Sequence, residues 1–532
     1  MIAKVNAFTL QGLDALPVEV EAGVYNGLPD FTIVGLPDAV LRESRERVRS
    51  AVVNAGYQWP VRRMLVNLAP AHIRKEGSGL DLAVGVSLLK ASGQLPGLDT
   101  NAIVFTGELS LDGSLRGTRG VLAAALSMDR WPDKILAVPA ANREEALRGT
   151  GRVLAIDSLE QLSDGVLMKR KMLEAMTGSV LAGEDDEDAV NTTNVVGVTH
   201  AADVGAGYGN SAHSFSDDAA LFYELSMVRG QNKAKRALEL AAAGGHHLLL
   251  IGPPGSGKSL LARCLQGILP PMTREETLEV NRVYSAAGLL NQENPWISKR
   301  PFRSPHAGIT KAGLLGGGMP FRPGEISLAH HGVLFIDELP EMDRNCLESL
   351  RQPLEEGQVT LSRAWGSITM PAHIQLVASA NPCPCGYYGE YPPKCKCLDH
   401  EIRRYQNRFS GPLMDRVDMV VQAPRPDAES LTNEKPEGES SYMIARRVAE
   451  VWQRRKQRER SESSNLESLR KQLTTKSKKW AVLAYDKHQL SARGYYRMLL
   501  LARTIADMNG EDAIGVSALA EALEYRPGAA AG

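Results

Sequence analysis

The chain has 532 residues, 43% of them hydrophobic, and a formal net charge of −1 at pH 7. This length predicts about three or four domains, and the hydrophobic content excludes a wholly disordered chain. A nearly neutral chain has no global basic field, so charge alone does not favour nucleic acid as a partner. The N-terminus has no basic, apolar leader and no stretch of about 18 apolar residues occurs, which predicts a soluble cytoplasmic protein without a membrane partner.

Residues 1–165 alternate β-like runs with helical ones. The β-like runs are FTIVG, MLVNLAP, AIVFTGELSL and KILAVPA, and the helical pattern is clearest in DAVLRESRERVRSAVVNAG. We therefore expect one α/β domain in this region. The next residues, 166–220, are polar and rich in Gly, Ser and Asp, which predicts a flexible linker.

Residues 221–425 are expected to form a nucleotide-binding domain, because they contain LLLIGPPGSGKS at positions 248–259. In this P-loop pattern backbone N–H groups curl around phosphate oxygens, Lys258 reaches the β- and γ-phosphates, and the Ser259 hydroxyl ligates Mg²⁺. The apolar run before the motif and the helix-forming LLARCLQGIL after it favour a true P-loop over a chance glycine-rich turn. We expect ATP or GTP to contact Gly252, Pro253, Pro254, Gly255, Ser256, Gly257, Lys258, Ser259 and Leu260.

Polar residues follow two further apolar runs. VLFIDE at positions 333–338 predicts a strand buried on both faces that ends in two carboxylates, where a parallel sheet presents its functional edge. We expect Asp337 to hold Mg²⁺ through its water shell and Glu338 to act as the general base. Adjacent acids are often solvated turns, but their place after a P-loop favours this site. IQLVASANPCPC ends its apolar run at Asn381, whose amide we expect to position the lytic water.

Four of the six cysteines gather in one short segment, as CPC and then CKC. In a reducing compartment such a cluster favours metal binding over disulfide bonds, which predicts a structural Zn²⁺. Because Cys-x-Cys is tighter than the commoner Cys-x-x-Cys, a redox-sensitive or merely tolerated surface loop stays the alternative. The predicted zinc ligands are Cys383, Cys385, Cys395 and Cys397.

Residues 357–372, GQVTLSRAWGSITMPA, predict a hairpin with two β-prone arms around Trp365 and Gly366 and with Arg363 near the tip. After a loose patch, DAESLTNEKPEGESS, residues 426–532 predict a helical domain. Its basic stretches, RRVAEVWQRRKQRER and RKQLTTKSKKW, favour solvated helices over DNA contact.

Together these motifs resemble one family. The P-loop, GEISLAHHGVLFIDELPE, the hairpin, SANPCPCG and RYQNRFSGPLMDRVDM are similar to the AAA+ ATPases of the magnesium-chelatase-like branch, specifically the ComM/YifB group. The similarity covers nearly the whole chain. It implies an α/β fold in which a P-loop AAA+ core with a helical lid follows a Lon-protease-like domain of the ribosomal S5 domain 2-like type.

The resemblance also implies a homo-oligomeric ring, usually a hexamer, with ATP between neighbouring subunits. Arg416 in GPLMDRVDM resembles an arginine finger that reaches into the next subunit's site. Arg493 in LSARGYYRMLLLARTIAD resembles the sensor-2 arginine of the lid, and Gln231 in SMVRGQ lies where the family's backbone contacts adenine. Without the flanking motifs, a charge on a surface helix is the favoured interpretation of either arginine.

For the N-terminal domain, the resemblance implies the fold of the Lon-protease catalytic domain. A working Lon-type site needs a serine nucleophile activated by a lysine. In this chain Gly79 of KEGSGLDLAVGVSLL stands where the serine belongs, and Thr118 and Gly120 of GSLRGTRGVLAAA stand where the lysine falls. We therefore expect an inactive domain, with residual hydrolysis through the neighbouring Ser78 as the alternative.

ComM-like proteins are associated with DNA branch migration during integration of transforming DNA, whereas the chelatase branch drives metal insertion into porphyrin. We expect a helicase-type motor that uses ATP and Mg²⁺ to move along single-stranded or branched DNA, independently of sequence, in competence or homologous recombination. Arg363 at the hairpin and Lys311 beside the Gly316–Gly318 run are the candidate pore contacts to phosphate. Subunit packing is the alternative role of Lys311, and a chelatase-type motor that remodels a protein partner is the alternative function.

Overall fold

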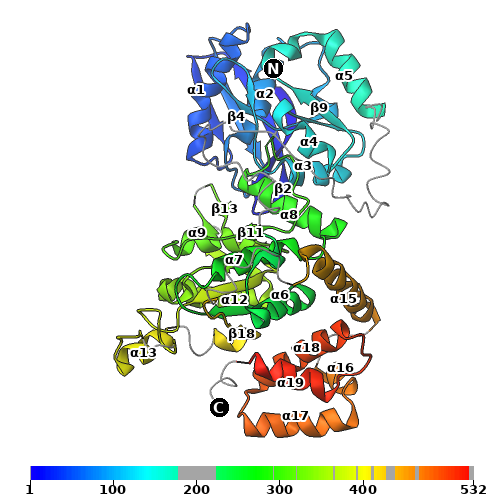
Figure 1. The fold of residues 1–532 in the computed structure, drawn as a ribbon. Coiled ribbons are helices and arrows are strands. Elements are labelled where there is room, and N and C mark those ends of the chain that lie inside the picture. Colours follow the sequence, from blue (N-terminus) through cyan, green and yellow to red (C-terminus); the bar gives the residue numbers. More distant parts are fainter. Residues whose placement is uncertain are drawn as a thin grey trace, which may run out of the picture. The chain divides into compact units, whose positions relative to one another are not determined.

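A computed structural model describes the chain as two compact units (Figure 1). Unit 1 comprises Met1–Phe215 with Asn281–Trp296, and unit 2 comprises Ser216–Val280 with Ile297–Gly532. The residues described are 2–177, 223–291, 293–318, 320–363, 366–390, 394–408, 413–426, 438–461 and 466–526. Among them, no helix combines the length and the apolar character needed to cross a bilayer.

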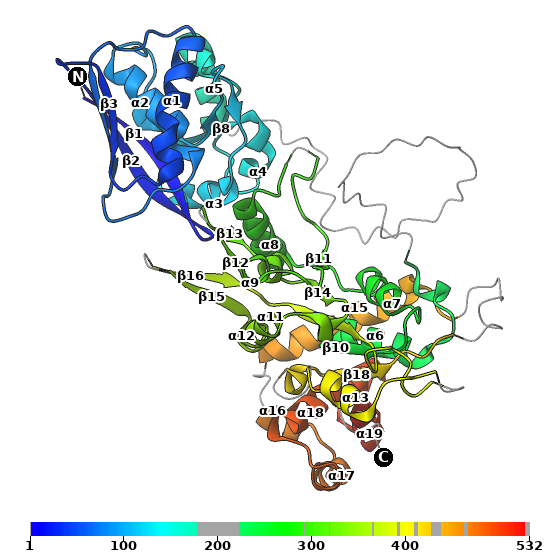
Figure 2. The same cartoon turned by 90° about the vertical axis from the view of Figure 1, so that its left-hand side faces the viewer.

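Unit 1 is built on one seven-stranded sheet (Figure 2). Its strands are β1 (Ile2–Gln11), β2 (Asp14–Tyr25), β3 (Asp30–Val34), β4 (Arg63–Ala69), β5 (Ile103–Phe105), β8 (Ile135–Pro139) and β9 (Val153–Ile156). They lie in the order β3-β4-β2-β1-β5-β8-β9. β2 pairs antiparallel with both β1 and β4, and the other neighbours are parallel. A separate short pair joins β6 (Glu108–Leu109) to β7 (Leu115–Arg116).

The helices of unit 1 are α1 (Ala39–Asn54), α2 (Asp81–Ala91), α3 (Val121–Leu126), α4 (Arg143–Leu147) and α5 (Gly165–Thr177). α1 begins after Asp38, because the carboxylate of this residue accepts the Leu41 N–H at 2.8 Å and caps the first turn. α2 packs against β1 and β2, and almost every one of its side chains is buried. The predicted α/β character of this region is confirmed.

The helix α8 (Arg274–Ala287) begins in unit 2 and ends in unit 1. Within unit 1, the Ser285 hydroxyl donates to the buried carboxylate of Glu145, which also accepts the Leu122 N–H at 2.9 Å. Arg282 forms an ion pair with Asp14 at 3.0 Å. These bonds explain why residues 281–296 group with unit 1, although they lie far along the chain.

Unit 2 is built on a five-stranded parallel sheet. Its strands, in spatial order, are β11 (Phe302–Arg303), β14 (Val333–Ile336), β17 (Gln375–Ala380), β10 (Leu248–Ile251) and β18 (Met419–Gln422). Leu248 and Leu250 belong to one apolar core cluster and Leu249 to another, so β10 is buried on both faces. This mixed α/β architecture is consistent with an AAA+ core.

Unit 2 also contains helices and two short hairpins. The helices are α6 (Asn232–Gly244), α7 (Lys258–Cys264), α8, α9 (Lys311–Leu315), α10 (Glu325–Leu328), α11 (Arg344–Ser349), α12 (Arg351–Glu356) and α13 (Asp399–Gln406). The hairpins pair β12 (Gly316–Gly317) with β13 (Arg322–Pro323), and β15 (Gln358–Arg363) with β16 (Gly366–Pro371). The second of these confirms the hairpin predicted at residues 357–372.

The C-terminal part of unit 2 is helical, as predicted. Its helices are α15 (Ser441–Ser461), α16 (Leu466–Lys471), α17 (Thr475–Lys487), α18 (Ala492–Met508) and α19 (Val516–Glu524). Buried residues of α18 and α19 belong to the same core cluster as Leu248 and Leu250 of β10. The helices therefore share a core with the sheet, and their function as a lid stays a prediction.

Candidate nucleotide site and cysteine cluster

The P-loop connects the carboxyl end of β10 to the start of α7. Gly255 and Gly257 have φ angles of +73° and +86°, which an L side chain rarely adopts. A Cβ atom on Gly252 would lie 2.1 Å from the carbonyl oxygen of Ala423, so only glycine fits at that position. The loop is therefore the strand–turn–helix that the sequence predicts.

Lys258 lies at the centre of the loop, with a residue exposure of 8%. Its Nζ donates to the carbonyl oxygens of Gly252 at 2.8 Å and Pro253 at 2.9 Å, and to Oδ1 of Asn381 at 3.2 Å. Burial lowers the pKa of Lys258, and the charges of two nearby carboxylates oppose that shift. The ammonium is thus held at a place where phosphate oxygens are its natural partners.

The carboxylate of Asp337, directly after β14, faces the same loop. Its Oδ2 accepts the Ser259 hydroxyl at 2.8 Å, and its other oxygen accepts the Ser379 hydroxyl. A hydroxyl and a carboxylate side by side are hard oxygen ligands, so this pair fits Mg²⁺. Glu338 is exposed, with a φ of +52°, and its N–H donates to the Ser379 hydroxyl at 3.0 Å.

Ser379 was missed by the sequence argument, because it lies within an apolar run of β17. It joins Asp337 to the backbone of Glu338 and so fixes the orientation of both. Gln231, at the start of α6, donates from its side-chain amide to the Ser256 carbonyl oxygen of the P-loop. Within the described residues, the buried hydroxyl of Ser256 has no hydrogen-bond partner, which is consistent with a ligand at the loop.

Arg416 and Arg493 do not lie at the P-loop. Both contact the carboxylate of Glu355, near the end of α12. Arg416 is buried and forms an ion pair with Glu355 at 2.7 Å, and Arg493 at the start of α18 contacts the same carboxylate oxygen. Arg416 lies three residues before the start of β18, and the Asp418 N–H donates to the His247 carbonyl oxygen, just before β10, at 3.0 Å. The pair therefore lies at the amino edge of the sheet, opposite the P-loop.

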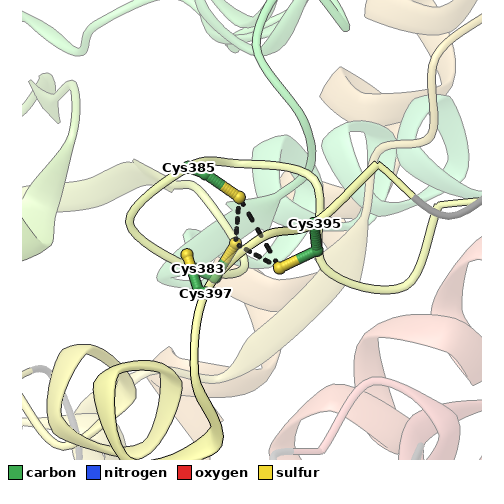
Figure 3. A group of neighbouring side chains, drawn as sticks. All are labelled: Cys383, Cys385, Cys395 and Cys397. Carbon is green, nitrogen blue, oxygen red and sulfur yellow. Dashed lines mark hydrogen bonds between the residues drawn. The ribbon is translucent and has the colours of Figure 1, made fainter.

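The four predicted zinc ligands converge in a loop after β17 (Figure 3). The Sγ of Cys383 lies 3.3 Å from that of Cys385 and 3.7 Å from that of Cys395, and the last two are 3.6 Å apart. The Sγ of Cys397 is within 4.8 Å of the others. Four sulfurs at 2.3 Å from a tetrahedral Zn²⁺ would be about 3.8 Å apart, and a disulfide needs about 2.05 Å. The cluster therefore fits zinc.

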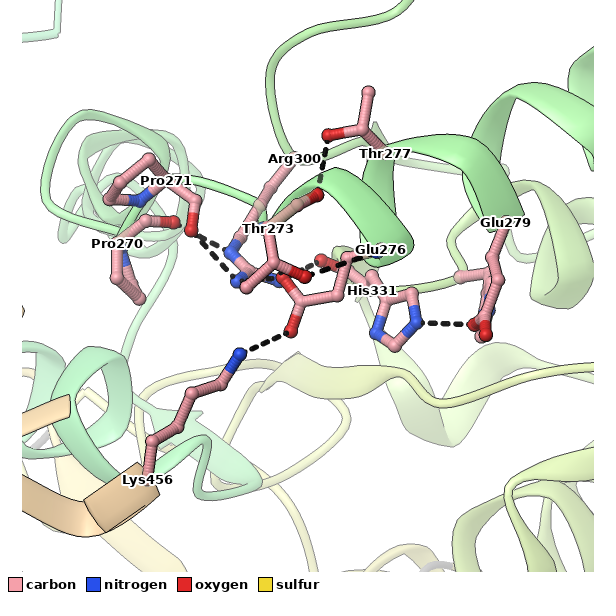
Figure 4. Close-up of polar contacts among 10 residues, drawn as sticks. Pro270, Pro271, Thr273, Glu276, Thr277, Glu279, Arg300, His331 and Lys456 are labelled. Atoms are coloured by element: carbon pink, nitrogen blue, oxygen red, sulfur yellow. Dashed lines mark hydrogen bonds and ion pairs between the residues drawn. The ribbon is translucent and has the colours of Figure 1, made fainter. Parts of the chain in front are cut away.

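A second group of metal-ligand types contains Glu279, His330 and His331. His330 Nδ1 accepts the His373 N–H at 3.1 Å, so its proton is on Nε2, which lies 3.0 Å from Glu279. A protonated Nε2 cannot bind a metal, and we assign this group to hydrogen bonding. Nearby, the carboxylate of Glu276 forms an ion pair with Arg300 at 2.7 Å. Figure 4 shows this ion pair and the hydrogen bond between His331 and Glu279.

The two residues predicted to contact DNA, Lys311 and Arg363, belong to other segments of unit 2. Lys311 is exposed at the first position of α9, and the Gly316–Gly318 run enters the short β12–β13 pair. Arg363 ends β15, but its side chain, like all of Trp365, lies outside the described residues. Their contact with DNA stays a prediction.

In unit 1, a Cβ atom on Gly79 would lie 3.0 Å from Oγ1 of Thr118, so these two positions are adjacent. The Ser78 hydroxyl donates to the Glu108 carboxylate, and a carboxylate is not the lysine base that Lon-type chemistry needs. The geometry gives no support to hydrolysis through Ser78. Loss of protease function stays a prediction.

Three family descriptions match successive parts of the chain. They are "Subunit ChlI of Mg-chelatase" over residues 20–142, "Magnesium chelatase, subunit ChlI" over 224–431, and "Magnesium chelatase, subunit ChlI C-terminal" over 438–526. The central match implies an ATPase that uses ATP and Mg²⁺.

Two relatives match along almost their entire length. YifB of Escherichia coli (strain K12) is 38% identical over 97% of this chain and 95% of its own. Competence protein ComM of Haemophilus influenzae is 39% identical, with the same coverage of both chains. The magnesium-chelatase 67 kDa subunit of Heliobacterium mobile is 30% identical over 31% of this chain and 29% of its own. The chain therefore belongs to the magnesium-chelatase ChlI-like family of ATPases, together with YifB and ComM.

Proposed function

We propose that the chain is an ATP-driven DNA motor that works as a homo-oligomeric ring, with a hexamer expected, and that promotes branch migration in competence or homologous recombination. The observation that carries this proposal is the extent of the similarity. Competence protein ComM matches over 97% of the chain, whereas a magnesium-chelatase subunit matches over 31%. The match to ComM extends beyond the ATPase core to nearly the whole chain, so the specific function is expected to follow ComM.

In this proposal the carboxyl edge of the sheet carries out hydrolysis. Lys258 binds the β- and γ-phosphates, and Ser259 with Asp337 holds the metal ion. Mg²⁺, when bound, neutralises the charge that develops on the transferred phosphoryl group. Glu338 is exposed beside Asp337 and accepts a proton from the attacking water, and Asn381, bonded to Lys258, orients that water.

The amino edge of the sheet supplies the second half of the site to a neighbouring subunit. β10 and β18 pair over four residues, from Leu248 with Met419 to Ile251 with Gln422. At ~3.3 Å per residue, Arg416 before β18 is about 13 Å or more from the P-loop after β10. It cannot reach its own nucleotide across the buried sheet, so Arg416 and Arg493 are proposed to act on the nucleotide of the next subunit.

The DNA contacts of the proposed ring are Arg363 and Lys311. Arg363 ends the first arm of the β15–β16 hairpin, and Lys311 is exposed at the start of α9. Cations at such positions bind phosphate without reading bases, so we expect binding that tolerates any sequence and weakens with salt.

A chelatase-type motor is the second candidate. It is favoured by the three successive matches to magnesium-chelatase subunit ChlI, which together span most of the chain. In that case hydrolysis would remodel a protein partner and would be indifferent to DNA.

The test is the ATPase rate of the full chain with and without forked or branched DNA across a salt series, together with displacement of an annealed strand. A DNA motor is stimulated by branched DNA and displaces the strand, and a Lys258→Ala variant does neither. Arg363→Ala is expected to weaken single-strand binding and to reduce the salt slope by about one, while basal ATPase stays intact. Equal rates with and without DNA, without strand displacement, would favour the chelatase-type motor.

A further inference from the structure

The cysteine cluster begins directly beside the nucleotide site. Cys383 is fully buried and lies two residues after Asn381. The side-chain oxygen of Asn381 accepts a hydrogen bond from the Lys258 ammonium at 3.2 Å. The intervening Pro382 is also held, because its carbonyl oxygen accepts the Gln406 side-chain amide of α13 at 3.1 Å. Any change in the position of Cys383 is therefore transmitted to Asn381 through a very short, anchored segment.

A second contact joins the cluster to the P-loop itself. Gly386 follows Cys385 with a φ of +86°, and its N–H donates to the Cys383 carbonyl oxygen at 3.0 Å. A Cβ atom on Gly386 would lie 2.5 Å from Cδ of Pro254, so the backbone of the cysteine turn is packed against the P-loop. Only glycine allows this approach. The same loop lines a cavity of about 910 Å³ together with P-loop residues 251–253.

We propose that a Zn²⁺ bound by the four thiolates positions Asn381 and Pro254 against Lys258, so that metal occupancy controls the rate of ATP hydrolysis. Without the metal, only weak thiol hydrogen bonds join Cys395 to Cys383 and Cys385, and the sulfurs are too far apart for a disulfide. The turn at Gly386 would then be released from the P-loop. The cysteines act through other residues, so they are positioning residues and not catalytic ones.

This inference rests on the proposed ATPase function, and its test has readouts that do not depend on activity. The full chain is purified and its metal content is measured, and Co²⁺ is substituted to detect the absorption of tetrahedral thiolate ligands. The variants Cys385→Ser and Cys397→Ser are compared with Cys346→Ser, a buried cysteine outside the cluster. Amide hydrogen exchange of residues 248–259 and 381–386 is then followed with and without metal.

We expect about one zinc per chain in the wild type and in Cys346→Ser, and none in the cluster variants. Loss of zinc is expected to lower kcat for ATP by about 10- to 100-fold, with little change in nucleotide affinity, and to speed exchange in both segments. Should the cluster variants fail to fold, chelation of the wild-type protein followed by zinc return gives the same comparison, and recovery of kcat supports the proposal.

Two results would overturn the inference. The first is a fully active wild-type protein that contains no metal. The second is a folded, zinc-free protein with unchanged kcat and unchanged exchange at the P-loop. If the zinc-bound wild type hydrolyses no ATP but its P-loop exchange still responds to zinc, the proposed function fails and the positioning by the cluster stands.

Discussion

The two edges of the five-stranded sheet in unit 2 carry different sets of polar side chains. At the carboxyl edge, the Lys258 ammonium donates to Asn381, and the hydroxyl of the next residue, Ser259, donates to Asp337. At the amino edge, Arg416 and Arg493 converge on a single carboxylate, that of Glu355, and the P-loop lies at the opposite edge. In the proposed ring, the carboxyl edge of one subunit would be completed by the arginines at the amino edge of the next.

The strongest test of the carboxyl edge is the loss of its base. Glu338→Gln is expected to lower ATP turnover by about 10²- to 10⁴-fold and to retain ATP binding, because the amide cannot accept the proton of the attacking water. Steady-state hydrolysis and binding of a fluorescent ATP analogue measure the two properties separately. Glu341→Gln, an exposed acid three residues further along, is the matched control and should hydrolyse ATP normally. Normal turnover by Glu338→Gln would remove the assigned base.

The amino edge is tested by the loss of its arginine. Arg416→Ala is expected to lower turnover about 10³-fold, because the developing charge on the phosphoryl group loses its cationic partner. If Arg416 acts on the nucleotide of a neighbouring subunit, as proposed, mixing inactive Arg416→Ala with inactive Lys258→Ala protein should restore part of the activity. Each variant alone provides the control. No recovery in mixtures that demonstrably form mixed rings would show that Arg416 does not act on the nucleotide of a neighbouring subunit.

Much of the carboxyl edge could be predicted from the sequence, because its signals are local. The glycines and Lys258 of the P-loop adopt the predicted turn within a few residues of chain. Asp337 and Asn381 could be placed beside it because parallel strands present their carboxyl ends at one edge. The four cysteines were likewise close in sequence before they were found close in space.

The contacts that could not be predicted are long-range ones. Glu355 looks like an ordinary exposed helix acid in RQPLEEGQ, and only the fold brings Arg416 and Arg493 to it. Nothing in the sequence around Ser285 indicates a long-range partner. In the structure its hydroxyl donates to the buried carboxylate of Glu145, and residues 281–296 group with unit 1. The β1–β2 hairpin also went unpredicted, since charged and polar residues interrupt its apolar alternation.

Glu355 offers a finer test of the amino edge. Its pKa is lowered mainly by the hydrogen bond from Arg416, so the carboxylate is charged and holds both arginines. Glu355→Gln is expected to lower kcat about tenfold with little change in KM for ATP, because the arginines remain but are no longer held together. The neighbouring exposed Glu356, changed to Gln, is the matched control. A rise in KM with unchanged kcat would instead assign Glu355 to nucleotide binding.

A last test of the amino edge concerns acid stability and not catalysis. His247 and His330 lie before β10 and β14, and each accepts a backbone N–H at Nδ1 at 3.1 Å. Burial lowers the pKa of each to about 4. Between about pH 6.5 and 4 the unfolded chain takes up a proton that the folded unit refuses, so stability falls as the pH falls.

For His330 this loss amounts to about 3 kcal/mol at most, and it is complete near pH 4. His330→Gln removes the titrating group, so the thermal midpoint of unit 2 should depend less steeply on pH between 6.5 and 4 than that of the wild type. The exposed His488, changed to Gln, is the matched control and should leave the slope unchanged. If His330→Gln has the wild-type slope, then acid sensitivity does not arise at this buried histidine.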